Sequence, residues 1–304
     1  MVMEKTISFE CGQTRHVIFF KDSRDMSEIR DNSVHLVVTS PPYPMIEMWD
    51  DLFSSFDHRI AEVLQYLKEK GKSLPAQQAL RLMNEAYDLM HEVLLFPVWD
   101  EISRVLVDGG IACINIGDAT RSIAGLFRLY PNHAKTIEFF EKKGFVSLPY
   151  ILWKKPTNKP NAFLGSGFLP PNAYVTLDVE YILLFRKGRA RAFPPKYQLR
   201  YESAYTKEER DRWFTQIWDD IKGERQIHSK LYRRTASFPE EIPRRLIRMF
   251  SIKQDVVLDP FLGLGTTTKV AAELGRNSIG YEIDDSLYDV IVERLGLNQP
   301  LLFK

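Results

Sequence analysis

The feature that most constrains this chain is a strand, a glycine turn, a helix and a second strand that follow one another near its C-terminal end. Asp255–Asp259 is a short apolar run that leads through Gly263 and Gly265 into a helix predicted from about Thr266 to Leu274. Ser278–Glu282 then has the pattern of another buried strand. Strand, helix and strand in this order form a right-handed βαβ unit. The pattern therefore predicts an α/β fold built on a parallel sheet.

Apolar runs earlier in the chain extend this prediction. Val34–Thr39 and Ile111–Ile116 have the composition of strands buried on both faces, with a turn expected at Asp108–Gly110. Between them, residues 76–107 carry apolar side chains at helical spacing, and Pro97 is expected to break or restart this helix. Further elements are predicted as a helix at His133–Lys143 and strands at Val146–Trp153 and Glu180–Phe185. We expect a doubly wound, mostly parallel, Rossmann-like sheet.

The glycine loop, defined here as Pro260–Gly265, has the features of a cofactor site. Gly263 and Gly265 let the backbone approach a ligand closely, and the start of the following helix offers free N–H groups. Glu282 ends the next strand, where an acidic side chain can accept both hydroxyls of a ribose. The third glycine of a dinucleotide loop is replaced by Thr268, and no Gly-Lys-Ser/Thr follows. The pattern indicates a nucleotide-like cofactor, and an ordinary strand-to-helix turn is the alternative.

The second candidate is the tetrapeptide Ser40-Pro41-Pro42-Tyr43, which follows the strand Val34–Thr39. Two prolines make a rigid extended turn without backbone N–H donors. This geometry directs carbonyl oxygens and the Ser40 hydroxyl into the crevice at the strand ends, where they can accept hydrogen bonds from an exocyclic amino group. The Tyr43 ring offers a flat face for stacking a planar ring. A proline-stiffened loop with an amphipathic tyrosine is the alternative interpretation.

The composition argues against membrane-spanning, disulfide-rich and metal-binding chains, and it shows one uneven distribution of charge. The 44% hydrophobic and 27% charged residues are typical of a globular chain, and no apolar stretch is long enough to span a membrane. Two cysteines, Cys11 and Cys113, and dispersed histidines predict neither a disulfide framework nor a metal site; they suit a reducing, cytoplasmic location. Residues 186–248 hold 17 Lys or Arg against 9 Asp or Glu, although the whole chain is balanced. This segment is a candidate polyanion-binding surface, or else a solvated mixed surface.

Taken together, the two motifs resemble the S-adenosylmethionine-dependent DNA amino-methyltransferases. The tetrapeptide comes first and the loop Asp-Pro-Phe-x-Gly-x-Gly-Thr-Thr last, an order similar to the circularly permuted β group. Supporting blocks are Arg104–Gly110 with Asn115–Asp118, Ile151–Pro156 with Asn158, and Ala236–Ile247. The resemblance covers the chain except about 45–90 and the middle basic segment. It implies a methyltransferase core with its catalytic half at residues 1–153 and its cofactor-binding half at 236–304. The inserted target-recognition region is expected at 154–235 and includes a core strand near 180–186.

The resemblance implies transfer of a methyl group from S-adenosylmethionine to N4 of a flipped-out cytosine in double-stranded DNA, with S-adenosylhomocysteine as the other product. In this family Ser-Pro-Pro-Tyr goes mostly with N4-cytosine and Asp-Pro-Pro-Tyr mostly with N6-adenine, so N6-adenine methylation is the alternative. Members of the family often act beside a restriction endonuclease that cuts the same site, without a stable complex, and such an enzyme is expected to associate with the nucleoid.

The resemblance also assigns residues to roles. The catalytic residues are expected to be Ser40, Pro41, Pro42 and Tyr43. The cofactor-binding residues are expected to be Asp22, Phe238, Pro239, Asp259, Phe261, Gly263, Gly265, Thr266, Thr267 and Glu282. DNA contacts are expected from Arg186, Lys187, Arg189, Arg191, Arg233 and Arg234.

Two other classes remain as rivals at this stage. A non-catalytic DNA-binding specificity module would not require Ser40, Tyr43, Gly263 and Glu282 together, yet all four are present. A protein or RNA methyltransferase usually has the cofactor loop before the catalytic loop, which is the reverse of the order here. Ring-carbon methylation of cytosine needs a nucleophilic thiolate, and neither cysteine lies in a loop that would activate it. The central expectation is that the tetrapeptide and the glycine loop face one crevice.

Overall fold

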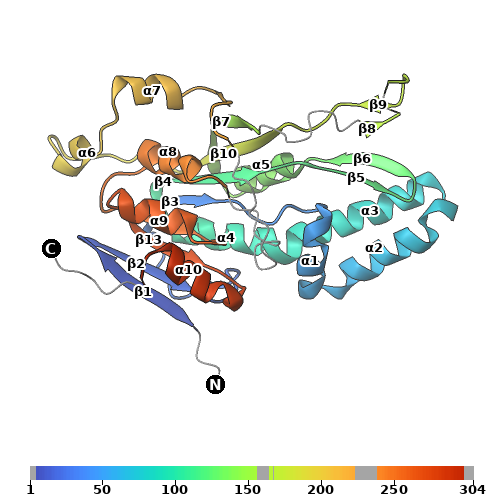
Figure 1. Cartoon of the computed structure of the whole chain (residues 1–304), viewed down its shortest axis with the longest axis horizontal. Coiled ribbons are helices and arrows are strands. Elements are labelled where there is room, and N and C mark those ends of the chain that lie inside the picture. The colour runs from blue at the N-terminus through green and yellow to red at the C-terminus, as the bar shows by residue number, and fades with distance from the viewer. Residues whose placement is uncertain (1–4, 156–163, 167, 223–237, 298–304) are drawn as a thin grey trace.

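A nine-stranded mixed sheet forms the centre of the molecule in a computed structural model, which describes residues 5–155, 164–166, 168–222 and 238–297 (Figure 1). Its strand order is β1-β2-β13-β12-β3-β4-β10-β7-β11. The strands are β1 Thr6–Cys11, β2 Thr14–Phe19, β3 Val34–Thr39, β4 Leu106–Ile116, β7 Phe145–Lys154, β10 Val179–Lys187, β11 Ile217–Trp218, β12 Val256–Asp259 and β13 Asn277–Tyr281.

The strands from β2 to β4 run parallel, so their carboxyl ends meet at one edge of the sheet. β12 lies between β3 and β13 and pairs in parallel with both, which brings a C-terminal strand against an N-terminal one. β10 is antiparallel to both β4 and β7, so its first residues lie at this same carboxyl edge and its last residues at the opposite edge. The predicted doubly wound, mostly parallel sheet with permuted order is confirmed.

Helices cover both faces of the sheet because side chains alternate along each strand. Val37 and Ala112 point to the face covered by α4 (Phe96–Val105) and α5 (Asn132–Lys142). Leu36, Val38 and Cys113 point to the face covered by α8 (Glu241–Phe250) and α9 (Thr266–Glu273). A smaller cluster packs η5 (Asp285–Leu287) and α10 (Tyr288–Arg294) against β1 and β2.

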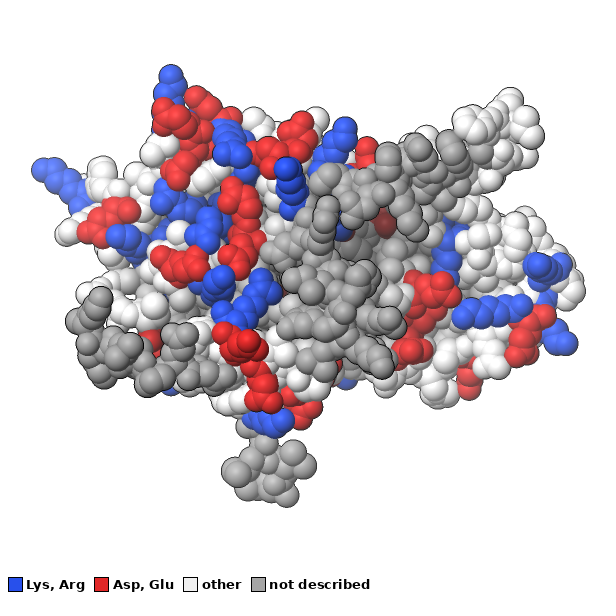
Figure 2. All heavy atoms as spheres, viewed as in Figure 1, with Lys and Arg blue, Asp and Glu red and all other residues white. Residues whose placement is uncertain are grey.

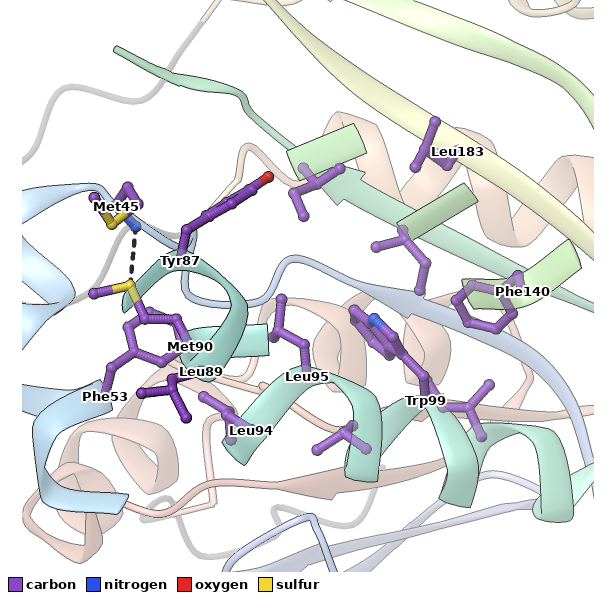
Figure 3. Packing of buried hydrophobic residues seen from close by; sticks show 14 of the residues in the cluster. Met45, Phe53, Tyr87, Leu89, Met90, Leu94, Leu95, Trp99, Phe140 and Leu183 are labelled. Carbon is purple, nitrogen blue, oxygen red and sulfur yellow. Dashed lines mark hydrogen bonds between the residues drawn. The ribbon is translucent and has the colours of Figure 1, made fainter. Parts of the chain in front are cut away.

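The stretch between the tetrapeptide and β4 is helical. It contains η1 Glu47–Trp49, α1 Asp50–Phe56, α2 His58–Lys70, η2 Gly71–Ser73, α3 Ala76–Met90 and one π-helical turn, η3 His91–Leu95, before α4. α2 and α3 lie side by side and extend away from the sheet (Figure 1). Met45 and Phe53 pack against Met90, and the row of buried side chains continues through Leu95 to Trp99 beneath the sheet (Figure 3).

Two short hairpins project at the same end of the molecule as α2 and α3 (Figure 1). They are β5 Ala119–Ile123 with β6 Leu126–Tyr130, and β8 Leu164–Gly165 with β9 Ala173–Tyr174. Phe127 of one hairpin stacks on Tyr174 of the other, with ring centroids 4.7 Å apart. Two short helices, α6 Gln198–Glu202 and α7 Lys207–Trp213, complete the described elements.

Two sequence expectations on local structure change. The turn expected at residues 108–110 is a bulge inside β4, where the pairing register with β3 shifts between Val34 and Leu36. The short strand β11, from the expected target-recognition region, belongs to the central sheet. Two other expectations hold, because the helix restarts at Pro97 in the first turn of α4, after the π-helical turn η3, and β10 is the core strand expected near 180–186.

Candidate active site

A cavity of about 1050 Å³ opens at the carboxyl edge of the sheet. Its lining includes the whole tetrapeptide Ser40–Tyr43 as well as Asp259–Gly263 and Glu282 from the other end of the chain. In a doubly wound sheet this edge is the usual place for ligands. The volume lies at the upper end of the range for ligand pockets. The expectation that both motifs face one crevice is therefore confirmed.

Asp259 holds the two motifs together at the bottom of this cavity. Its Oδ1 accepts hydrogen bonds from Thr39 Oγ1 at 2.6 Å and from the Phe261 backbone N–H at 3.1 Å. Its Oδ2 accepts one from Thr267 Oγ1 at 2.6 Å. Burial raises the pKa of Asp259 to about 6. Asp259 thus lines the cavity and also positions the two motifs, whereas Thr267 lies outside the lining and donates its hydroxyl to Asp259.

The glycine loop and Glu282 form the far side of the cavity. Gly263 and Gly265 have φ angles of 56° and 80°, which only glycine adopts without strain. The Gly263 N–H donates to Glu282 Oε2 and the Asp284 N–H to Glu282 Oε1, both at 2.8 Å. Burial raises the pKa of Glu282 to about 7. Glu282 therefore shapes the loop and presents a carboxylate to the cavity.

Thr266 differs from its neighbour Thr267. Thr266 lines the cavity and is 2% exposed, and its hydroxyl has no hydrogen-bond partner among the described residues. A buried hydroxyl is costly to leave unpaired. The unpaired hydroxyl at the start of α9 fits a polar ligand such as the methionine part of S-adenosylmethionine.

Of the other expected cofactor residues, some line the cavity and the rest lie behind its wall. Asp22 and Phe238 line the cavity, whereas Pro239 is buried and outside the lining, and Gly265 caps α9. Asp22 accepts hydrogen bonds from the backbone and side chain of Arg24, at 2.9 and 2.8 Å. The lining positions suit a cofactor that extends along the carboxyl ends of β2, β12 and β13.

A hydrogen-bonded network lies behind the tetrapeptide. Ser40 Oγ is 3.0 Å from the Tyr43 hydroxyl, which donates to Glu180 Oε2 at 2.9 Å. Asn115 Nδ2 donates to the same Glu180 oxygen at 2.7 Å, and Lys155 forms an ion pair with the other Glu180 oxygen. Ser40, Tyr43, Lys155 and Glu180 all line the cavity. The network anchors the tetrapeptide to β4, β10 and the end of β7.

Sequence reasoning did not single out Asn115, Lys155 or Glu180 as site residues. A signal was present, because Asn115 and Glu180 are isolated polar residues within apolar strands. Buried polar side chains in such strands must have partners. Sequence reasoning also gave no role to residues 45–90, whose first part walls the cavity with Ile46, Met48, Trp49, Leu52 and Phe56. Arg121 of β5 holds this wall through Asp50, with two hydrogen bonds of 2.8 and 2.6 Å.

The expected DNA contacts by the cations near residue 190 require correction. Lys187 donates to Asn32 Oδ1 and to the backbone oxygens of Ser103 and Leu106. Arg191 makes two hydrogen bonds to the buried carboxylate of Asp255, at 2.6 and 2.9 Å. Both cations hold the fold together.

Arg186 and Arg189 lie at and beyond the last residues of β10. Arg186 pairs with Ile111 in the middle of β4, and Arg189 is exposed past the end of β10. Lys187 follows Glu180 by seven residues, roughly 20 Å along an extended strand. A DNA contact by Arg186 or Arg189 would therefore lie away from the cavity, and it stays a prediction. Arg233 and Arg234 lie outside the described residues.

The basic segment is also neutralised by local ion pairs. Around α6, α7 and α8, Lys and Arg alternate with Asp and Glu on the surface (Figure 2). Arg245 pairs with Asp220 and Glu241, and Arg248 pairs with Glu209. The described part of this segment is thus a mixed surface and does not form one basic patch.

The described ranges also bear on metal ligands, membrane-spanning helices and cysteines. They contain no group of three or more His, Cys, Asp or Glu side chains that could hold a metal ion. None of their helices is long and apolar enough to cross a membrane. Cys113 is buried, and burial raises the pKa of its thiol well above the usual value. Cys11 is exposed on β1, away from the cavity lining.

A Rossmann-like sheet with a cofactor loop and a proline tetrapeptide on one cavity defines a class of methyltransferase. The family described as DNA methylase, which covers the N6 and N4 amino-methyltransferases, matches residues 34–293. The chain belongs to this family of DNA methyltransferases, which use S-adenosylmethionine.

Individual relatives agree with the family. The chain is 67% identical to the Type II methyltransferase M.MjaI of Methanocaldococcus jannaschii, over 94% of this chain and 93% of that protein. It is 51% identical to the Type II methyltransferase M.MthZI of Methanothermobacter thermautotrophicus, over 93% of this chain and 77% of that protein. The crystal structure of TTHA0409 from Thermus thermophilus, complexed with S-adenosyl-L-methionine, matches with a TM-score of 0.69 and 32% identity, over 94% of each chain.

Proposed function

We propose that this DNA methyltransferase transfers the methyl group to the exocyclic N4 of cytosine. The observation that carries the proposal is the place of Ser40, whose hydroxyl lies on the same cavity as the glycine loop, Thr266 and Glu282. A neutral hydroxyl at this position can accept a hydrogen bond from the N–H of an exocyclic amino group. The family resemblance of Ser-Pro-Pro-Tyr to cytosine-N4 enzymes supports the same choice.

The residues act by binding and orienting. S-adenosylmethionine, when bound, supplies an electrophilic methyl group on a sulfonium. Ser40 Oγ and the Pro41 carbonyl accept hydrogen bonds from the target amino group, which makes the nitrogen lone pair available for attack. Glu282 would hold the ribose and Thr266 the methionine end, which would present the methyl group to the target nitrogen. Alignment of this kind lowers barriers by about 7–11 kcal/mol. As the nitrogen–carbon bond forms, the bond between the methyl carbon and sulfur breaks, S-adenosylhomocysteine is left, and the amino group releases one proton to solvent.

The proposed substrate is a base in double-stranded DNA, and such a base must leave the helix to reach the cavity. Flipping costs a few kcal/mol, and stacking on an aromatic ring offsets about 1–3 kcal/mol of it. Tyr43 is the proposed stacking partner, and the wall at residues 46–56 adds Trp49 and Phe56 to the lining. We also propose, from the Type II methyltransferase names of M.MjaI and M.MthZI, that a restriction endonuclease recognises the same site without forming a stable complex.

One experiment tests the choice of base. The protein is incubated with unmethylated DNA of mixed sequence and S-adenosylmethionine labelled in the methyl group, and the digested nucleosides are separated and weighed by mass spectrometry. We expect label in N4-methylcytosine, and none from the Ser40→Ala variant at matched concentration. Label in N6-methyladenine would replace the proposal with the alternative base, and label in neither nucleoside would contradict both.

A further inference from the structure

Glu180 collects the hydrogen bonds of the network behind the tetrapeptide, although it comes from a different strand. Tyr43 and Asn115 donate to its Oε2 at 2.9 and 2.7 Å, and Lys155 pairs with its Oε1. Glu180 is 8% exposed, so its carboxylate is buried and held by three donors. A buried carboxylate with this many donors determines where their protons point.

The direction of each hydrogen bond follows from a count of protons. A tyrosine hydroxyl has one proton, and an ionised carboxylate only accepts. The Tyr43 proton therefore points to Glu180, and burial raises the pKa of Tyr43 well above its usual value, so the hydroxyl keeps that proton. Ser40 Oγ is 3.0 Å from the Tyr43 oxygen, which is now an acceptor. Asn115 Nδ2 donates to the same oxygen at 3.0 Å, and the remaining lone pair of that oxygen can accept the Ser40 proton. In this arrangement the Ser40 proton points to Tyr43.

With the hydrogen bonds in these directions, the Ser40 oxygen has lone pairs available to accept a hydrogen bond. Asn115 Nδ2 approaches Ser40 Oγ at 3.3 Å, a longer contact that also comes from a donor. Ser40 lines the cavity, so the side of Oγ that faces the ligand carries a lone pair and no proton. An amino group that must give up an N–H to a hydrogen bond requires such an acceptor.

We propose that Glu180 is a positioning residue that, by accepting the hydrogen bond of the Tyr43 hydroxyl, makes the Ser40 hydroxyl a hydrogen-bond acceptor toward the target amino group. The inference rests on the role given to Ser40 in the proposed function, and it holds for an amino group on cytosine or on adenine. Lys155 supports the arrangement, because its ammonium group occupies the second carboxylate oxygen of Glu180.

The Glu180→Gln variant is the sharpest test because it keeps the shape of the side chain and replaces the carboxylate by a neutral amide. Lys155 can only donate, so the amide oxygen will face Lys155 and the amide N–H groups will face the Tyr43 oxygen, while Asn115 Nδ2 loses its acceptor on this residue. The Tyr43 proton then turns to Ser40, and the Ser40 proton turns into the cavity. We expect kcat on mixed-sequence plasmid DNA to fall on the order of 10²-fold. The KM for DNA and the Kd for S-adenosylhomocysteine should each change by less than about threefold. Asp178→Asn, an exposed carboxylate-to-amide change two residues away, should leave kcat unchanged.

A double-mutant cycle separates action through Tyr43 from direct contact. The Tyr43→Phe variant lacks the hydroxyl that links Glu180 to Ser40. Adding Glu180→Gln to that variant should lower its kcat by less than about threefold. An undiminished loss in that background would overturn the proposal, because Glu180 would then contact the base itself. A fall in thermal midpoint and in S-adenosylhomocysteine affinity parallel to kcat would also overturn it, by indicating a structural role.

Neutron diffraction tests the proposal without any activity. In the wild-type protein the exchanged deuteron of Tyr43 should lie toward Glu180 and that of Ser40 toward Tyr43. A Ser40 deuteron directed into the cavity would overturn the proposal even if the enzyme methylates cytosine. Conversely, wild-type protein that methylates no DNA while showing the expected deuterons would contradict the proposed function alone.

Discussion

Thr39 Oγ1 donates a 2.6 Å hydrogen bond to Asp259 Oδ1 and so joins the last residues of two neighbouring strands. Thr39 precedes the tetrapeptide and Asp259 precedes the glycine loop. The distance between the amino-group acceptor and the cofactor loop therefore depends on this contact. Asp259 is buried and its pKa is raised to about 6. At neutral pH it is therefore a buried carboxylate that depends on three hydrogen-bond donors, one of which is Thr39.

Loss of the Thr39 hydroxyl should destabilise the protein in a pH-dependent manner. Thr39→Val keeps the shape and removes one donor from a buried carboxylate, which we expect to cost about 1–3 kcal/mol of unfolding free energy at pH 7.5. The loss should shrink at pH 5, below the pKa of about 6, where Asp259 is protonated. Urea unfolding at the two pH values measures the difference. Thr215→Val, at an exposed threonine, should stay within about 0.5 kcal/mol of wild type at both. An equal loss at pH 5 and pH 7.5 would contradict this account.

In the wild-type protein, the contribution of Asp259 to the unfolding free energy should fall as pH rises, whereas that of a salt-bridged aspartate would increase. Asp259 has a folded pKa above its ordinary value, so the unfolded chain releases its proton near pH 4 while the folded chain retains it to about pH 6. This group lowers the stability of the fold as pH rises through that window, by about 3 kcal/mol for a shift near two units. The Asp259→Asn variant should lack this component, as seen in urea unfolding at pH 4.5 and pH 7. If the unfolding free energies of the wild type and the Asp259→Asn variant changed in parallel with pH, the raised pKa of Asp259 would be disproved.

Cofactor affinity should rise with pH through Glu282. Burial raises the pKa of Glu282 to about 7, and ribose hydroxyls donate to the ionised carboxylate. Binding therefore competes with a proton, and below about pH 7 the Kd for S-adenosylhomocysteine should weaken by up to tenfold per pH unit. Glu282→Gln should bind more weakly with a flat profile between pH 6 and pH 8, whereas Glu293→Gln should follow wild type. Calorimetry that finds no pH dependence in wild type would reject the ribose role.

Thr266 and Thr267 should respond differently to the same substitution. The Thr266 hydroxyl is unpaired on the cavity, so Thr266→Val should weaken S-adenosylhomocysteine binding by about tenfold and leave stability within about 0.5 kcal/mol. The Thr267 hydroxyl donates to Asp259, so Thr267→Val should destabilise the fold by about 1–3 kcal/mol. Calorimetry and urea unfolding on both variants make the comparison. Identical behaviour of the two would remove the distinction drawn between them.

Arg191 should contribute to the stability of the fold and not to DNA binding. Its two hydrogen bonds to the buried Asp255 make Arg191→Met a loss of about 3–5 kcal/mol, because an unpaired carboxylate remains. Arg189→Ala, at an exposed neighbour, should be close to neutral in unfolding. The salt dependence of DNA binding should keep its slope in the Arg189→Ala variant. A slope reduced by about one would return this edge of the sheet to the DNA-binding surface.

Much of the core could be predicted because its signals are local. The strand Val34–Thr39 has the predicted bounds, and Val256–Asp259 and Asn277–Tyr281 begin or end within one residue of the prediction. Each is a short apolar run bounded by proline, glycine or charge, which is what a strand buried on both faces requires. The common cavity followed from the rule that ligands lie at the carboxyl ends of parallel strands.

The parts that sequence reasoning missed depend on contacts between distant segments. Glu180 belongs to the site because β10 runs antiparallel to β4, and no local pattern reveals that direction. The excess of lysine and arginine at residues 186–248 suggested a DNA surface, yet a count of charges does not show that Arg191 meets Asp255 or that Arg245 meets Asp220. A buried cation and an exposed one contribute equally to composition, although only the exposed one can reach a phosphate.

The position of β12 between β3 and β13 has a consequence for synthesis on the ribosome. The tetrapeptide leaves the exit tunnel well before β12, the strand that completes its cavity, has been translated. A nascent chain interrupted before residue 256 has no glycine loop to hold a methyl donor. Modification of DNA therefore waits until β12 and the glycine loop have been made, and fragments terminated before them have no methylating capacity.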